Sequence, residues 1–101
     1  MFRRARFADV IETQLDLFLR EHRDVLAEVD DRLRAYNGAS RDEAEELYGD
    51  YVDAVDAGAE ILAEMRDHFA RTLDEADEYV GAFNRVVAKR LPAYAAAVES
   101  L

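Results

Sequence analysis

Apolar side chains recur every three or four positions from Ser40 to about Leu91. This spacing is typical of a helix that buries one stripe, and it predicts one long amphipathic helix over about residues 41–91. Ser40, with Glu43 three residues later, matches a capping box at the start of that helix. The predicted stripe consists of Ala44, Tyr48, Tyr51, Val55, Leu62, Met65, Phe69, Leu73, Ala76, Val80, Phe83, Val87 and Leu91.

The same periodicity occurs earlier in the chain and predicts a first helix over about residues 5–36. Asn37-Gly38 ends it, because Gly is favoured at the left-handed position that follows a helix. The turn then spans residues 37–40, and a connection this short makes the two helices antiparallel neighbours. After Pro92, which cannot continue a helix, we expect residues 92–101 to form a weak tail.

Gly58 occupies one position of the buried stripe, where the register of the hairpin brings it level with Phe18 and Leu19. Because Gly inside a helix costs roughly 1 kcal/mol relative to Ala, its position there needs a packing reason. We interpret it as a notch that lets the two helices approach each other closely.

The second predicted helix is longer than the first, so its last turns lack a partner within the hairpin. Large apolar side chains would then be left in water, although burying each one is worth roughly 1.5–3 kcal/mol. A twofold homodimer with a four-helix bundle would cover them with one self-complementary surface. The predicted interface consists of Val80, Phe83, Val87 and Leu91.

The alternative is a break near residues 71–77, after which the chain folds back as a monomeric three-helix bundle. Thr72 and Glu75 match a second capping box and favour this break. No Gly, Pro or Asn lies between Ala59 and Val80, which favours the unbroken helix.

The chain has 101 residues, with 23 Asp and Glu against 13 Lys and Arg, and a net charge of −10. We expect a single helical domain over residues 1–101. This acidity disfavours nonspecific binding to nucleic acids, which depends on neutralising phosphates with Lys and Arg. No apolar run approaches the roughly 20 residues that span a bilayer, so we expect no membrane span and a cytoplasmic location. Cysteine is absent, so disulfides and thiolate chemistry are excluded.

Charge is segregated along the chain. Residues 42–78 carry fourteen acidic residues and two arginines, whereas Arg85, Lys89 and Arg90 form a basic end. This pattern favours contact between the basic end of one subunit and the acidic part of another. The other interpretation is a solvated helix face whose basic C-terminus suits the helix dipole.

Glu64 and His68 lie one turn apart on the second predicted helix, and the hairpin register brings Glu12 level with them. Carboxylates and a His that converge between helices bind iron, manganese or zinc in helical bundles. The Glu-x-x-His hallmark of ferritin-like sites is absent, and such clusters also arise by chance in an acidic chain. We therefore expect no cofactor and keep this metal site as an alternative.

No catalytic pattern is present. Ser40 and Ser100 are the only serines, and the chain has neither a phosphate-binding Gly loop nor a Cys/His constellation. His22 lies within the first apolar stripe, where a lone His is interpreted as a core residue. The basic segment over residues 2–7 has too few arginines to predict binding to RNA or to an anionic membrane.

The Tyr36-Asn37-Gly38 turn between two helices resembles the Trp-x-Gly turn of the small helical hairpins exported by type VII secretion systems. The likeness covers roughly residues 5–80 and implies a small secreted hairpin that needs a partner for export. Tyr stands where that family has Trp. The family's Tyr-x-x-x-Asp/Glu export motif is absent, since Tyr79 and Tyr94 are followed four residues later by Phe83 and Val98.

Taken together, these features predict an all-helical structural or partner-binding protein that self-associates by coiled-coil-like pairing, most simply as a homodimer, and that is not an enzyme. The expected partner is a second copy of the chain, with another protein as the alternative.

Overall fold

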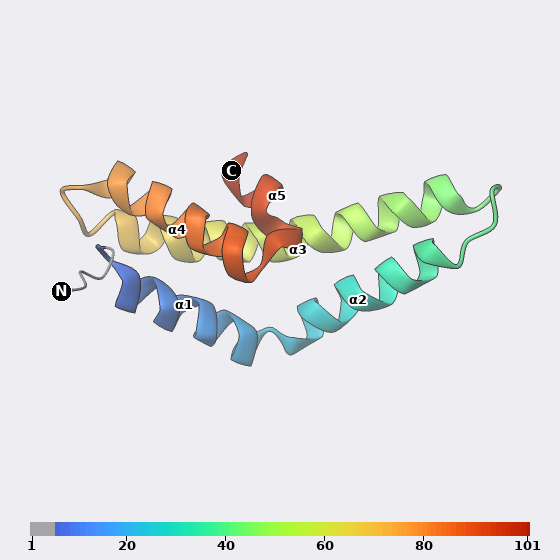
Figure 1. Ribbon diagram of the computed structural model, residues 1–101, viewed down its shortest axis with the longest axis horizontal. Helices are drawn as coiled ribbons and strands as arrows, with labels where there is room; N and C mark the ends of the chain where they lie inside the picture. Colours follow the sequence, from blue (N-terminus) through green and yellow to red (C-terminus); the bar gives the residue numbers. More distant parts are fainter. Residues whose placement is uncertain (1–5) are drawn as a thin grey trace.

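The computed structural model describes residues 6–101, which form five α-helices, one 3₁₀ helix and no strand (Figure 1). The prediction of an all-helical chain is confirmed. Over the same residues, no helix combines the length and the apolar character that crossing a membrane requires. The elements are α1 (Ala8–Glu21), α2 (Arg23–Asn37), α3 (Ala44–Ala70), α4 (Ala76–Arg90), η1 (Pro92–Tyr94) and α5 (Ala95–Glu99).

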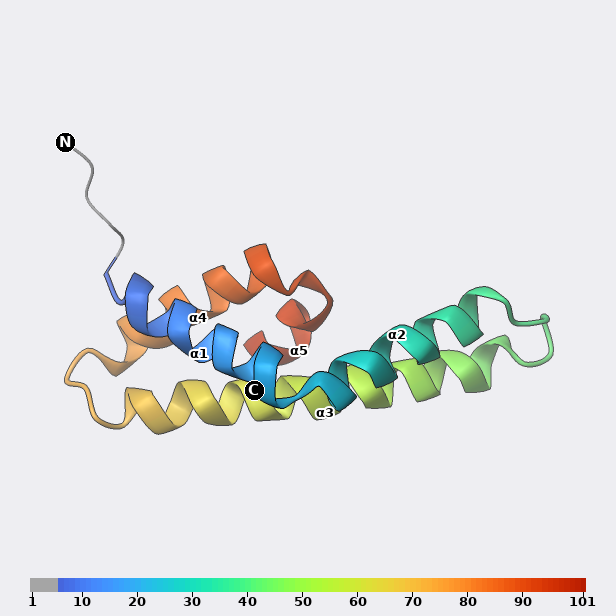
Figure 2. The same ribbon diagram turned by 90° about the horizontal axis from the view of Figure 1, so that it is seen from below.

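Helix α3 runs the length of the molecule, and different helices cover its two halves (Figures 1 and 2). α2 pairs with the N-terminal half, and together with the connecting turn they project as an arm, defined here as residues 23–57. α1, α4, η1 and α5 gather at the C-terminal half and form the body, defined as residues 6–22 and 58–101. The molecule is consequently elongated, measuring 53 × 26 × 23 Å.

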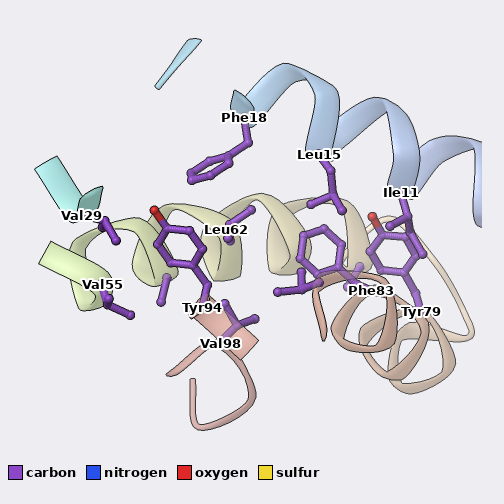
Figure 3. Packing of buried hydrophobic residues seen from close by; sticks show 13 residues of the cluster. Ile11, Leu15, Phe18, Val29, Val55, Leu62, Tyr79, Phe83, Tyr94 and Val98 are labelled. Carbon is purple, nitrogen blue, oxygen red and sulfur yellow. The ribbon is translucent and has the colours of Figure 1, made fainter. Parts of the chain in front are cut away.

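The hydrophobic core lies in the body (Figure 3). Side chains from α1, α3, α4 and α5 interdigitate there and exclude water. In the arm, by contrast, only Val29 and Val55 among the larger apolar residues are buried. The fully buried large side chains are Ile11, Leu15, Phe18, Leu62, Tyr79, Phe83, Val87 and Val98.

The second predicted helix is broken. α3 ends at Ala70, and α4 begins at Ala76 and returns along the body. The prediction of one helix over residues 41–91 is therefore wrong, and the break near residues 71–77 that was the alternative is what the structure shows.

Thr72 contributes to this break, although not as a helix cap. Its hydroxyl donates a hydrogen bond of 2.7 Å to the carbonyl oxygen of Phe69, and the N–H of Leu73 donates one of 3.0 Å to the carbonyl oxygen of Ala70. These bonds satisfy carbonyl groups that another helical turn would have used. Glu75, which precedes α4, makes no side-chain capping bond, so the second capping box does not form.

Hydrophobic burial explains why the chain folds back. Tyr79, Phe83 and Val87 on α4 are all 0% exposed in the core. Each such side chain contributes about 1.5–3 kcal/mol when it leaves water. A continuous helix would instead keep a few backbone hydrogen bonds, each worth about 0.5–1.5 kcal/mol net. Burial therefore outweighs local helix continuity.

The first predicted helix is also divided, at His22. This residue has φ −121° and ψ 43°, so it leaves the helical conformation, although its N–H still donates to the carbonyl oxygen of Phe18 at 3.0 Å. The bend lets α1 pack against α4 while α2 stays along α3 (Figure 2). The helix expected over about residues 5–36 is thus two helices, and residue 5 lies outside the described residues.

The turn between α2 and α3 differs in detail from the prediction. Gly38 has φ −95°, not the expected left-handed conformation, and its N–H donates to the carbonyl oxygen of Arg34 at 3.1 Å. The Ser40 hydroxyl donates to the carboxylate of Glu43 at 2.9 Å, so the two capping-box residues meet through their side chains. α3 begins only at Ala44, and the turn is longer than residues 37–40.

The C-terminal residues are not a weak tail. Pro92 opens η1, and Tyr94 and Val98 are buried in the core. The ring of Tyr94 lies against Gly58, where a Cβ atom would be only 3.1 Å from Tyr94 Cζ. A notch at Gly58 therefore exists, but it accommodates Tyr94 and not Phe18 or Leu19, because η1 reaches this face of α3.

The Tyr94 hydroxyl is buried and has no hydrogen-bond partner among residues 6–101. Burial raises the pKa of Tyr94, with smaller contributions from the charges of Asp30 and Tyr51. This ring therefore holds its position through apolar packing, which includes an edge-to-face contact of 5.9 Å with Phe18.

Arg66 on α3 is 3% exposed and joins three helices. Its Nη1 donates to Asn84 Oδ1 on α4 at 3.1 Å and to the carbonyl oxygen of Val98 on α5 at 3.0 Å. Its Nε donates to Asp67 Oδ1 at 2.8 Å. A buried guanidinium needs such partners, and here they fix α4 and α5 relative to α3.

Gln14 on α1 makes a second polar connection across the core. The Tyr79 hydroxyl donates to Gln14 Oε1, and Gln14 Nε2 donates to the carbonyl oxygen of Met65 at 3.1 Å. Burial raises the pKa of Tyr79 to about 12, so the phenol stays protonated and remains a donor at neutral pH. This chain of bonds links α4, α1 and α3.

Candidate functional site

The three residues of the candidate metal site are not brought together. Glu64 and His68 line one groove of about 370 Å³ between α1 and α3, with Gln14, Leu17, Ile61 and Met65. Glu12 instead accepts a hydrogen bond of 2.7 Å from Nη1 of Arg90 on α4. Among residues 6–101, no group of three or more His, Cys, Asp or Glu side chains is arranged to hold a metal ion.

His68 also has a cation beside it. Its Nδ1 lies 3.5 Å from Nη2 of Arg71, one turn further along the chain. A guanidinium at this distance competes with a metal ion for the imidazole nitrogen, and its positive charge repels the metal cation. The groove with Glu64 and His68 therefore offers a His and a carboxylate on an apolar wall, and no further ligand.

His22 agrees with its interpretation as a packing residue. It is half-buried at the bend between α1 and α2, and its ring lies 5.5 Å from that of Phe18. The basic segment over residues 2–7 is described only from Arg6 onward, and Arg3 and Arg4 lie outside the described residues.

The predicted interface residues belong to the body. Phe83 and Val87 are completely buried, and Val80 and Leu91 are half-buried against the same core. They were expected to be exposed because the second helix was expected to continue past its partner, and the fold-back of α4 removes that reason. Phe83 and Val87 are therefore not available to a second copy, and Val80 and Leu91 are available only in part.

A groove that the sequence did not predict lies between α1 and α4. It has a volume of about 420 Å³ and an apolar floor. Phe7 anchors one end of it, because its ring packs edge-to-face on Tyr79 at 5.3 Å. The floor is formed by Phe7, Ala8, Ile11, Ala82 and Val86, and the charged rim by Arg6, Glu78, Arg85 and Lys89.

The rim of this α1–α4 groove carries positive charge that is available to a ligand. Arg6 donates to Glu75 at 3.0 Å and to Glu78 at 3.4 Å, so its charge is balanced within the chain. Arg85 and Lys89 are exposed and have no ion-pair partner among residues 6–101. An apolar floor with unpaired cations at its edge suits an anionic, partly apolar partner.

One signal in the sequence pointed to this rim, since Arg85 and Lys89 were recognised as part of a basic end. Their four-residue spacing places them on one side of α4, next to Ala82 and Val86. The third member, Arg90, is used differently, because it pairs with Glu12 and with Asp16 at 3.0 Å. Without the fold-back of α4 the groove itself was not foreseeable.

The arm presents the opposite chemistry. Residues 23–57 carry eleven acidic residues against four arginines. Tyr48 is 51% exposed and Leu33 is 38% exposed. The rings of Tyr36, Tyr48 and Tyr51 follow one another, with centroids 5.2 and 6.2 Å apart. The arm is thus acidic and partly apolar.

No protein-family model, curated protein or solved structure matches the chain.

Proposed function

We propose that this chain is a non-catalytic structural protein that self-associates, using the arm as its association surface. The observation that carries this proposal is the unequal cover of α3. In the body, α4, η1 and α5 lie over α3 (Figure 1), and Ala59, Arg66 and Ala70, which share one face of α3 by helical spacing, are buried. Tyr48 and Val52 continue that face into the arm by helical spacing, where Val52 is only half-buried and Tyr48 stays 51% exposed although its ring lies 5.2 Å from that of Tyr36.

Two helices alone form a single layer, and a single layer leaves one side of each apolar stripe in water. Leu33 and Tyr48 are the largest apolar side chains of the arm that are left exposed in this way. Tyr36 lies 5.2 Å from the Tyr48 ring and one turn from Leu33, and exposed apolar surface that joins up in this way is a candidate interaction site. A second copy of the chain would supply the missing layer.

Among residues 6–101 no three-ligand metal cluster is present, and the exposed apolar side chains of the arm are the feature that supports an association role. A structural role is therefore the function that the exposed surfaces support best. The expected affinity is modest, because few large side chains are available to offset the loss of translational and rotational freedom on association.

Analytical ultracentrifugation of the wild type from low micromolar to about 100 µM tests the proposal, since micromolar affinity corresponds to about −8 kcal/mol. We expect the mass to rise from that of one chain to that of a defined oligomer. Replacing Leu33→Ser together with Tyr48→Ser should shift this transition to higher concentration while the helical circular dichroism is retained. A wild type that remains a monomer throughout would contradict the proposal.

A further inference from the structure

We infer that the acidic face of the arm of one copy lies in the α1–α4 groove of a second copy, and that two such contacts related by a twofold axis form a closed dimer. This inference rests on the proposed self-association and names the surfaces that carry it. The partner is a second copy because both complementary surfaces occur on the same chain.

The acidic face of the arm is defined by Glu45, Tyr48, Gly49, Val52 and Asp56 on α3. At 3.6 residues per turn these five positions fall within an arc of about 100°. All are exposed except Val52, which is half-buried. The two apolar side chains, Tyr48 and Val52, therefore lie between carboxylates, which is the pattern of an amphipathic helix that docks into a groove.

Gly49 makes close approach to this face possible. A Cβ atom placed there would find no other atom within 4 Å, so the position is open to solvent. Within the chain, this Gly has no packing reason, although it lowers helix stability by roughly 1 kcal/mol relative to Ala. A partner backbone lying across α3 at this position would supply such a reason.

The groove and the face are of similar length, and the two cations of the groove lie together near one of its ends, where one end of the face would meet them. Arg85 and Lys89 are unpaired at the groove rim, and Glu45 and Asp56 are exposed on the face without an ion-pair partner among residues 6–101. Along α4 the groove extends from Glu78 to Lys89, which is about 16 Å at 1.5 Å per residue. The face from Glu45 to Asp56 has the same length.

Charge also excludes the simplest alternative, in which two arms pair with each other. Each arm carries eleven acidic residues against four arginines, so two arms side by side would repel each other. Placing each arm on the α1–α4 groove exchanges this repulsion for attraction to Arg85 and Lys89. Like charges disfavour the first arrangement and opposite charges favour the second.

The shape of the molecule permits both contacts at once. The arm lies at one end of a molecule 53 Å long, and helices α1 and α4, which line the groove, lie toward the other end (Figure 2). Two copies side by side in opposite directions place each arm next to the body of the other. A twofold axis then relates the two contacts, and the assembly closes as a dimer.

Charge reversal on each surface, and on both, tests this inference. The groove variant carries Arg85→Glu and Lys89→Glu, and the arm variant carries Glu45→Lys and Asp56→Lys. Each variant alone should weaken the dimer at low salt by roughly 10-fold or more, which corresponds to about 1.4 kcal/mol. Mixing the two variants should restore a dimer, because both of its contacts then join opposite charges.

The matched control carries Arg20→Glu and Arg23→Glu, two exposed arginines near the bend at His22 that make no ion pair among residues 6–101. It changes the net charge as much as the groove variant does and should leave the dimer dissociation constant within about threefold of the wild type, less than 1 kcal/mol. A comparable loss in this control would contradict the specific contact, because it would show an effect of net charge alone.

Failure of this inference is distinguishable from failure of the proposed function. If the wild type dimerises but the groove variant dimerises equally well, the arm–groove contact is wrong and self-association stands. If the mixture of the two variants stays monomeric, the pairing of these two surfaces is wrong. If the wild-type mass grows with concentration without stopping at a dimer, the twofold closure is wrong. If the wild type is a monomer throughout, the proposed function itself fails.

Discussion

The body and the arm share helix α3, yet the packing that stabilises each region is different. In the body, α3 is enclosed by α1, α4, η1 and α5, and its buried face includes a charged residue with a full set of partners. In the arm, α2 is the helix that lies along α3, and the larger apolar side chains that are buried are two valines at the edge of the core. The same amphipathic helix therefore has a structural role at one end and presents a surface at the other.

The difference teaches that helical periodicity alone does not reveal which apolar residues are buried. Tyr48 and Phe83 belong to the same predicted stripe, but Tyr48 is half exposed and Phe83 is completely buried. What separates them is the number of helices that pack around them. Stability should consequently be concentrated in the body and interaction in the arm.

The largest expected effect comes from placing charges in the body core. Phe83→Asp with Val87→Asp should unfold the protein, because each lost side chain contributed about 1.5–3 kcal/mol and each new carboxylate is buried without a partner. The total exceeds much of the stability of a small domain. Circular dichroism should show the helix signal lost or the melting transition absent.

The matched pair in the arm is Leu33→Asp with Tyr48→Asp. Both side chains are partly in water already, so the fold and most of the helix signal should persist. If the arm pair unfolds the chain as completely as the core pair does, stability is not concentrated in the body.

An intermediate change in the free energy of unfolding is expected for one of two arginines that link helices, Arg66 in the body and Arg32 in the arm. Arg66→Met should lower the free energy of unfolding by roughly 2–4 kcal/mol, because the Asn84 side chain and the Val98 carbonyl lose their buried donor and each such loss costs about 1–3 kcal/mol. Arg32 in the arm pairs with Glu28 at 2.6 Å and with Asp50 at 3.8 Å in a solvated setting.

Arg32→Met should therefore cost only about 0.2–1 kcal/mol, the range for exposed ion pairs. Urea denaturation measures the free energy of unfolding of both variants. Equal losses would show that Arg66 is no more important than a surface residue, and would contradict its role in fixing α4 and α5.

The last pair of variants, at two glycines, should change the free energy of unfolding in opposite directions in the two regions. Gly58→Ala should destabilise the protein by roughly 1–3 kcal/mol, because the added Cβ atom would overlap the ring of Tyr94. Gly49→Ala should stabilise the isolated chain by about 0.5–1 kcal/mol, because Ala is the better helix former and its Cβ meets nothing within 4 Å.

Denaturation of both Gly variants must be measured where sedimentation shows a monomer, since Gly49 lies on the proposed contact face. Destabilisation by Gly49→Ala in the monomer would show that the arm packs against something within the chain, and the distinction between the two regions would fail there.

Several elements were predictable from local pattern. The stripe of Val25, Val29 and Leu33 and the stop at Asn37-Gly38 define α2 and its end because helical periodicity and Gly act over a few residues. The stripe from Tyr48 to Phe69 defines α3 for the same reason. The Ser40–Glu43 contact was predictable too, although the helix begins at Ala44.

The candidate sites were less predictable, because they depend on which helices meet. Glu12 was expected beside His68 from the register of a plain hairpin, whereas α4 returns on the other side of α1 and places Arg90 against Glu12. The α1–α4 groove exists only because of that return. Its cations were visible in the sequence, but its apolar floor was not.

The sequence by itself determined the helical class, the hairpin turn near Asn37-Gly38 and the acidity of the segment that follows it, since amphipathic spacing, turn residues and charge are local properties of the chain. Only the tertiary structure decided that α3 stops at Ala70, that His22 bends the first helix, and that Tyr94 fits against Gly58. The physical reason is that local helix preference around residues 71–75 differs little between continuing and stopping, whereas burial of Tyr79, Phe83 and Val87 against distant residues is worth several kcal/mol. The free energy gained from these long-range contacts cannot be read from the spacing of apolar residues within one segment.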